Sequence, residues 1–225
     1  MEPLVKILPN VKKFNSYFSD VKNNVSPIML SGLTDTAKSH IAYATEFYAE
    51  RPICIVTYNE MQAKRLVKDL SFFTSKVELF PKREIFAYDY LAESKDTLYE
   101  RIGVLNNIVN KKSKVIITTI EAIMQPMVDK KELYKNKLTL KINEECNLEE
   151  IKEKLILLGY ERYDLIEGRG QFSIRGGILD IAINNKEGIR VEFFGDEIDS
   201  IRKFNISTQR STDMLKKVDI YPAFE

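Results

Sequence analysis

The segment Gly32–Ser39 has the residue types of a phosphate-binding loop, and it follows an apolar run as such loops do. Gly32, Lys38 and Ser39 stand where the first glycine, the phosphate-binding lysine and the metal-binding hydroxyl are expected. Ala37 replaces the second glycine, whose missing side chain lets the backbone approach the phosphates. The sequence therefore predicts a degenerate, inactive nucleotide site, and no catalytic residue is assigned.

A second candidate for nucleotide chemistry is the acidic segment Gly195–Asp199, which follows the apolar run Val191–Phe194. In a helicase, acidic side chains after a buried strand would hold the metal ion. Alternation of apolar and polar residues resumes at Ile198, which favours a polar turn between two antiparallel strands. The alternative is a fragment of an ATP-dependent helicase whose site would contain Lys38, Ser39, Asp196 and Glu197.

The basic residues change in type along the chain. Up to Tyr160 there are 20 Lys and 4 Arg, whereas from Glu161 onward there are 4 Lys and 6 Arg. The planar guanidinium of arginine pairs with a carboxylate or phosphate through two hydrogen bonds, which a lysine cannot do. The last third of the chain is therefore the candidate recognition surface. Solvated or internally paired arginine side chains are the alternative.

Composition narrows the class of protein. The 225 residues include 34 Lys+Arg and 33 Asp+Glu, a formal charge of +1, so only a local patch could attract a polyanion. No apolar run approaches the roughly 20 residues of a spanning helix. Cys54, Cys146 and the single His40 form no disulfide framework or metal site, and Cys54 is expected to be buried. We expect a cytoplasmic monomer without metal, cofactor or membrane contact.

Strand-like and helix-like segments alternate between residues 28 and about 125, which predicts a parallel sheet covered by helices on both faces. Asn59 is the expected N-cap of a helix through Phe73. The expected strands are Ile28–Leu30, Ile53–Thr57, Val77–Phe80 and Val115–Thr118. A further helix is expected to bury a stripe of Leu98, Ile102, Leu105 and Ile108.

Beyond about residue 133 the pattern predicts a small α+β domain with an antiparallel sheet, so the fold class is α/β followed by α+β. A helix over Leu148–Leu158 should stop at Gly159, and Asn184–Gly188 should form a hairpin loop. The expected strands are Leu138–Ile142, Gln171–Arg175, Ile178–Ile183, Arg190–Phe194 and Ile198–Phe204.

Several stretches resemble one known family. They are Phe172–Ile181, Arg190–Arg202 and Thr208–Ser211, with further likeness in Phe86–Asp89, Glu100-Arg101 and Tyr221–Ala223. From about residue 28 the chain is similar to the amino-terminal UvrB-homology module of the bacterial transcription-repair coupling factors, the Mfd family. It departs from UvrB itself in two places. Ala37 replaces a glycine of the phosphate loop, and the segment from Leu91 to Asp96 is too short for the damage-probing hairpin of UvrB.

The resemblance implies the domain organisation and the binding residues. Residues 1–27 would pack on or link to the module, 28–132 would form a degenerate RecA-like domain similar to UvrB domain 1a, and 133–225 would resemble UvrB domain 2, which binds UvrA. Arg175, Arg190 and Phe194 match the UvrA contacts of the family.

The resemblance also implies a role in the cell. The chain would be an amino-terminal fragment of a longer ATP-dependent DNA translocase, whose downstream motor uses ATP and Mg. That parent protein would contact RNA polymerase stalled at a DNA lesion, and DNA, through other domains. This module would then recruit UvrA and so start nucleotide excision repair.

Strand alternation places the implied contacts on one face of the second domain. Val191 and Phe193 point to the core, so Arg190 and Phe194 point outward, as does Arg175 on its own strand. An outward Phe between arginines is typical of an interface hot spot, although Phe194 could instead cover a domain junction. A rival hypothesis places the arginines, with Tyr88 and Tyr90, on a DNA backbone; for duplex DNA we expect only weak, salt-sensitive binding.

Overall fold

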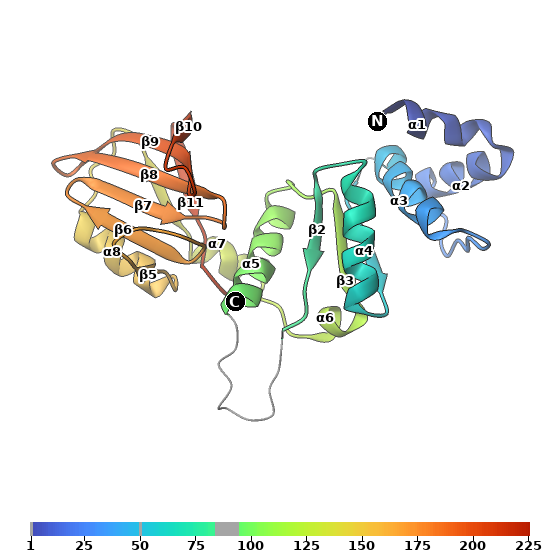
Figure 1. Cartoon of the computed structure of the whole chain (residues 1–225), viewed down its shortest axis with the longest axis horizontal. Coiled ribbons are helices and arrows are strands. Elements are labelled where there is room, and N and C mark those ends of the chain that lie inside the picture. The colour runs from blue at the N-terminus through green and yellow to red at the C-terminus, as the bar shows by residue number, and fades with distance from the viewer. Residues whose placement is uncertain (1, 50, 84–94) are drawn as a thin grey trace, which may run out of the picture. The chain divides into compact units, whose positions relative to one another are not determined.

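The computed structural model describes residues 2–49, 51–83 and 95–225 and divides the chain into two compact units. The first unit comprises Met1–Arg83 and Asn107–Pro126, and the second comprises Glu84–Asn106 and Met127–Glu225 (Figure 1). One sheet is parallel and the others are mainly antiparallel, which confirms the predicted mixed fold class. Residues 95–106 are grouped with the C-terminal part of the chain, and the domain boundary at residue 132 stays a prediction.

The first unit is built around a three-stranded parallel sheet of order β1-β3-β2. Its helix α4 packs on one face of the sheet through Ala63 and Leu70, which contact Val115 and Ile117 (Figure 1). The predicted cap is confirmed, since Asn59 Oδ1 accepts the Gln62 N–H at 2.8 Å. The elements are α1 (Glu2–Ile7), the 3-10 helix η1 (Leu8–Asn10), α2 (Lys12–Lys22), α3 (Asp35–Ala49), β1 (Ile53–Thr57), α4 (Glu60–Ser71), β2 (Val77–Phe80), β3 (Val115–Thr119) and α6 (Ile120–Met124).

Two expectations about this sheet are wrong. Ile28–Leu30 forms no strand, and Met29 is 89% exposed. The preceding Pro27 has no N–H to donate to a ladder, and three apolar residues bury little surface. Strand β1 is therefore an edge strand, and Cys54 on it is exposed rather than buried.

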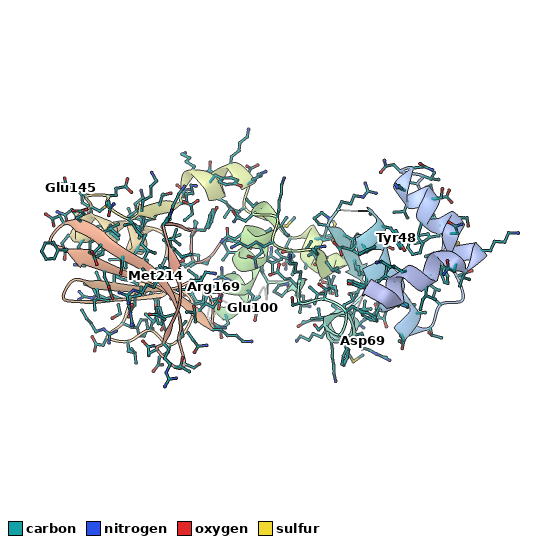
Figure 2. The ribbon with its side chains drawn as sticks, turned by 90° about the horizontal axis from the view of Figure 1, so that it is seen from above. Tyr48, Asp69, Glu100, Glu145, Arg169 and Met214 are labelled. Carbon is teal, nitrogen blue, oxygen red and sulfur yellow. The ribbon has the colours of Figure 1, made fainter. Side chains whose placement is uncertain are left out.

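The N-terminal helices α1 and α2 pack against α3 through a small apolar cluster around Val5, Phe18 and Ala44. The rings of Phe18 and Tyr48 lie 4.6 Å apart between centroids. Figure 2 shows Tyr48 beside these helices. Aromatic side chains therefore hold the helices together at the C-terminal end of α3.

Helix α5 (Lys95–Val109) spans the division between the units. The predicted helix is confirmed, but its buried face is not the predicted stripe: Ile102 is fully buried whereas Ile108 is 39% exposed. Arg101 takes a buried place because its Nε donates to Glu225 Oε2 at 2.7 Å. The buried face is therefore shifted toward Tyr99 and Val104, and it includes a paired charge.

The second unit contains a six-stranded sheet of order β10-β9-β8-β7-β6-β5, in which only β5 and β6 are parallel, and a separate β4–β11 pair. The predicted strands agree with the structure to within a few residues, and Gly159 ends α8 at φ +84°. The elements are α7 (Lys130–Lys135), β4 (Leu138–Lys141), α8 (Leu148–Leu157), β5 (Glu161–Arg162), β6 (Gln171–Arg175), β7 (Ile178–Ala182), β8 (Glu187–Phe194), β9 (Glu197–Asn205), β10 (Ser211–Leu215) and β11 (Lys217–Ile220).

Helix α8 covers one face of the six-stranded sheet (Figure 1), where Ile151 and Leu155 join a core that includes Leu179 and Val191. We call the opposite face the outer face. One end of the outer face is closed by the cluster of Ile166, Ala182, Phe204 and Ile206. The rest of it carries charged and polar side chains together with the exposed Phe194 and Met214, and Arg175 and Arg190 lie in this open part.

Candidate protein-docking site

The sheet register brings the candidate binding residues together on the outer face. Arg190 on β8 is paired with Asp180 on β7. Arg175 on β6 is paired with Ile178, which is two residues from Asp180 on the same strand. Phe194 is four residues beyond Arg190 on the same strand, so both side chains point away from Val191 and the core. We call Arg175, Asp180, Arg190, Glu192 and Phe194 the docking face.

A single buried carboxylate organises the two arginines. Asp180 is 1% exposed; its Oδ1 accepts the Arg190 Nε–H at 2.7 Å, and its Oδ2 accepts from Arg190 Nη2 at 2.9 Å. Arg175 Nη2 also donates to Asp180 Oδ2, at 2.9 Å. A carboxylate that accepts from two guanidiniums fixes both side chains, because each planar fork has one favoured orientation.

The Arg190 side chain makes two further contacts. Its guanidinium carbon lies 4.6 Å from the centroid of the Phe204 ring, and its Nη2 donates to Gln209 Oε1 at 3.2 Å. Hydrogen bonding to Asp180 raises the pKa of the Arg190 guanidinium, which is charged at any physiological pH. The side chain is only 18% exposed, less than its outward position on the strand predicts.

Phe194 and Arg175 are the exposed members of the docking face. Phe194 is 84% exposed at the end of β8, and Arg175 is 50% exposed. Beside them the chain turns at Gly176 and Gly177, and the Gly177 carbonyl accepts the Phe193 N–H at 2.8 Å. A side chain at Gly177 would come within 2.9 Å of the Phe193 carbonyl oxygen, so only glycine allows this close approach.

A second charged group continues the face across β8 and β9. Glu192 accepts a hydrogen bond from Arg202 Nη2 and another from Ser200 Oγ, the latter at 2.8 Å. Met214 on β10 is paired with Arg202 and is 66% exposed; Figure 2 labels this side chain. Charges of both signs therefore alternate over this face, and exposed apolar side chains lie within it and beside it.

The predicted phosphate loop has a different geometry from a working one. Helix α3 begins at Asp35, whose Oδ1 accepts from Lys38 Nζ at 3.1 Å. The Lys38 ammonium lowers the pKa of the Asp35 carboxyl group, and Arg65 lies 3.4 Å from its other oxygen. The Ala37 N–H donates to Thr34 Oγ1 at 3.3 Å. A carboxylate thus occupies the helix start and engages the lysine that phosphates would need.

The remaining sequence candidates fall in separate places. Asp196 lies in the β8–β9 turn of the second unit, which confirms the predicted turn, whereas Lys38 and Ser39 belong to the first unit. Tyr88 and Tyr90, with the Phe86–Asp89 motif, lie outside the described residues, as does most of Leu91 to Asp96. Among described residues, no group of three His, Cys, Asp or Glu side chains could hold a metal ion.

Comparison with protein families matches residues 138–225 to the model described as the UvrB interaction domain. This part of the chain is similar to that domain. Over the whole chain, the transcription-repair-coupling factor of Bacillus subtilis (strain 168) is 28% identical over 229 residues, 100% of this chain and 19% of the relative. Those of Staphylococcus aureus strains RF122 / ET3-1 and MRSA252 are 31% identical over 223 residues, 96% of this chain and 19% of each relative.

These matches confirm the family resemblance that the sequence motifs indicate. The chain spans about a fifth of the length of the curated relatives it matches. The docking face lies wholly within the UvrB interaction domain. Within the described residues, no helix combines the length and apolar character that crossing a membrane requires.

Sequence reasoning missed two features of the UvrB interaction domain. Asp180 is part of the motif that carries the resemblance, but its role as the shared partner of Arg175 and Arg190 was not predicted. A signal was present, because Asp180 is the one charged residue in the apolar strand Ile178–Ala182. The pairing of Glu192 with Arg202 depends on the strand register, which the sequence does not specify.

Proposed function

We propose that this chain is a UvrA-recruiting module of a transcription-repair coupling factor and that UvrA binds the docking face. The observation that carries the proposal is Phe194, a large apolar side chain that is 84% exposed beside arginines held in place by a buried carboxylate. Preorganised arginine and an exposed aromatic ring are the usual composition of a hot spot, because little side-chain entropy is lost on binding.

The three contacts have different tasks in this proposal. Phe194 would insert into an apolar pocket of UvrA, and Arg175, which is half exposed, would pair with an acidic side chain at the rim. Arg190 is 18% exposed and fully engaged with Asp180, so it would support the orientation of its neighbours more than contact UvrA.

The test measures the affinity of purified UvrA for the 225-residue chain and its variants. Phe194→Ala should weaken binding by about 1–3 kcal/mol, as truncation of a hot-spot residue does, without changing the melting temperature. Phe72→Ala is the matched control, because Phe72 is also exposed, at 67%, but lies in the first unit. Binding of Phe194→Ala at the parent affinity, or an equal loss in both variants, would contradict the proposal.

The proposal for the longer protein follows from the family. We infer that its motor, in another part of the protein, is an ATP-dependent DNA translocase that uses ATP and Mg. It would act on RNA polymerase stalled at a lesion and bind DNA through other domains. For the chain itself we propose no enzymatic activity and no cofactor, which the Asp35–Lys38 ion pair in the degenerate loop supports.

A further inference from the structure

The first unit contains a cleft of about 1140 Å³ that is separate from the degenerate phosphate loop. The residues that precede β1 and β3 line it, together with α2 and the C-terminal end of α3. Asp35 opens α3 and Glu46 lines the cleft, so at 1.5 Å per residue the two are about 16 Å apart along the helix. Whatever binds here would not use the phosphate loop.

The charge of this cleft is strongly one-sided. Among the described residues, four cationic side chains and one carboxylate line it, so 4 − 1 gives +3, whereas the whole chain is +1. The cations are Lys22, Arg51, Lys111 and Lys114, and the carboxylate is Glu46. We call this group the basic cleft.

Most of this positive charge is not neutralised by the protein. Lys22 and Lys111 are exposed, and neither has an ion-pair partner within the described residues. Arg51 donates to Asn24 Oδ1 at 3.0 Å, which is a neutral partner. In the part of the chain that the structure describes, only Lys114 is paired, through its Nζ, which lies 2.6 Å from Glu46 Oε1. Three charges therefore remain available to an anionic ligand.

The residue types favour a nucleic-acid strand over an acidic protein segment. Three of the four cations are lysines, which act as point charges along a phosphate backbone, and the fork of Arg51 matches a phosphate as well as a carboxylate. The aromatic rings of the cleft therefore decide between the two ligands. Phe47 and Tyr48 contribute half-buried rings to the same wall, and bases of an unpaired strand stack on such rings. The volume exceeds the upper end of small-ligand sites, about 1,000 Å³, which favours a polymer over a small anion.

We propose that the basic cleft binds single-stranded DNA through its phosphates. Lys22, Arg51 and Lys111 make the phosphate contacts, and Phe47 and Tyr48 support one or more bases. Glu46 limits the affinity, because this buried carboxylate, 4% exposed, engages the fourth cation. Binding is independent of sequence, since the contacts are to the backbone and to ring faces that every base presents.

The experiment measures the binding of a fluorescent 12-nucleotide oligo(dT) to the 225-residue chain over a range of salt concentrations. With three phosphate contacts the plot of log affinity against log salt should have a slope of about −2, from roughly −0.7 per contact. The triple variant Lys22→Glu, Arg51→Glu, Lys111→Glu should weaken binding about tenfold or more. The control carries the same change in charge on α7, with Lys130→Glu, Lys131→Glu and Lys135→Glu, and should bind like the parent.

A variant that is expected to bind more tightly distinguishes a lost phosphate contact from misfolding of the protein. Glu46→Gln frees Lys114 for a fourth contact, so the salt slope should steepen to about −3 and the affinity should rise. An unfolded protein cannot give this result. The proposal would be overturned if both triple variants lost binding equally, or if the salt slope of Glu46→Gln were unchanged. It would also be overturned if polyglutamate competed as effectively as unlabelled oligo(dT), or if duplex DNA bound as tightly as single-stranded DNA.

Discussion

The docking face and the basic cleft each contain a buried carboxylate, and they use it differently. Asp180, at 1% exposure, holds two arginines that would otherwise repel each other, and Glu46, at 4%, holds one of four cations. The docking face is therefore rigid and electrically balanced, with Phe194 as its exposed apolar part. The basic cleft instead contains exposed lysines that have no ion-pair partner among the described residues. The docking face is suited to binding a protein surface of complementary shape, whereas the basic cleft is suited to binding a flexible polyanion.

Removing Asp180 should have the largest effect. Asp180→Ala leaves Arg190, which is 18% exposed, without its ionic partner, and breaking a buried pair in this way costs about 3–5 kcal/mol. Glu46→Ala should cost clearly less, because Lys114 is 45% exposed and its charge can be hydrated. Urea denaturation of both variants measures the difference. Equal losses would show that the two carboxylates have the same role.

Alkaline pH should weaken the second unit through Tyr160. Burial raises the pKa of this phenol from 10 to about 12, and its hydroxyl donates to the Tyr221 carbonyl at 3.1 Å. Because the folded pKa is the higher one, the stabilisation is complete below pH 10 and is lost as pH rises from 10 to 12, by about 1.4 kcal/mol per pH unit. Tyr160→Phe should be less stable at neutral pH, by about 1 kcal/mol for the lost hydrogen bond.

The measurement for Tyr160 is the free energy of unfolding against pH for the parent and Tyr160→Phe. The two curves should cross between pH 10 and 12, because the parent loses more over this interval than the neutral-pH difference of about 1 kcal/mol, whereas the variant has no phenol to ionise at this position. Parallel curves over that interval would mean that Tyr160 does not control the alkaline transition.

The smallest expected effect is in the degenerate loop. Ala37→Gly should create neither ATP binding nor hydrolysis, because Asp35 still engages Lys38 and no metal-binding partner is supplied. Calorimetric titration with Mg-ATP checks binding, and phosphate release above a protein-free blank checks hydrolysis. Heat of binding in the parent chain that is abolished by Lys38→Ala would contradict this prediction, because it would show a working nucleotide site.

The sequence predicted most elements of the second unit, because regular alternation, Gly159 and the hairpin loops determine where its strands and helix begin and end. It predicted the side of the sheet on which Arg175, Arg190 and Phe194 lie for the same reason. It could not predict the shared role of Asp180, because that role depends on the register of β6, β7 and β8. It could not predict the basic cleft, because the cleft brings together residues far apart in the chain. The failure at Ile28–Leu30 has another cause: an apolar run becomes a strand only where a neighbour pairs with it.

The order of the strands has a consequence for how the chain reaches its fold. In the six-stranded sheet, strands β6 to β9 each pair with the next strand along the chain, so β6 to β10 can form as successive hairpins. The parallel sheet must instead bring Ile53 beside Val115, across some sixty residues. Local pairings close fast and distant ones slowly. In pulsed hydrogen exchange during refolding, the amide of Val191 should gain protection before that of Ile117, and the reverse order would show that the parallel sheet folds first.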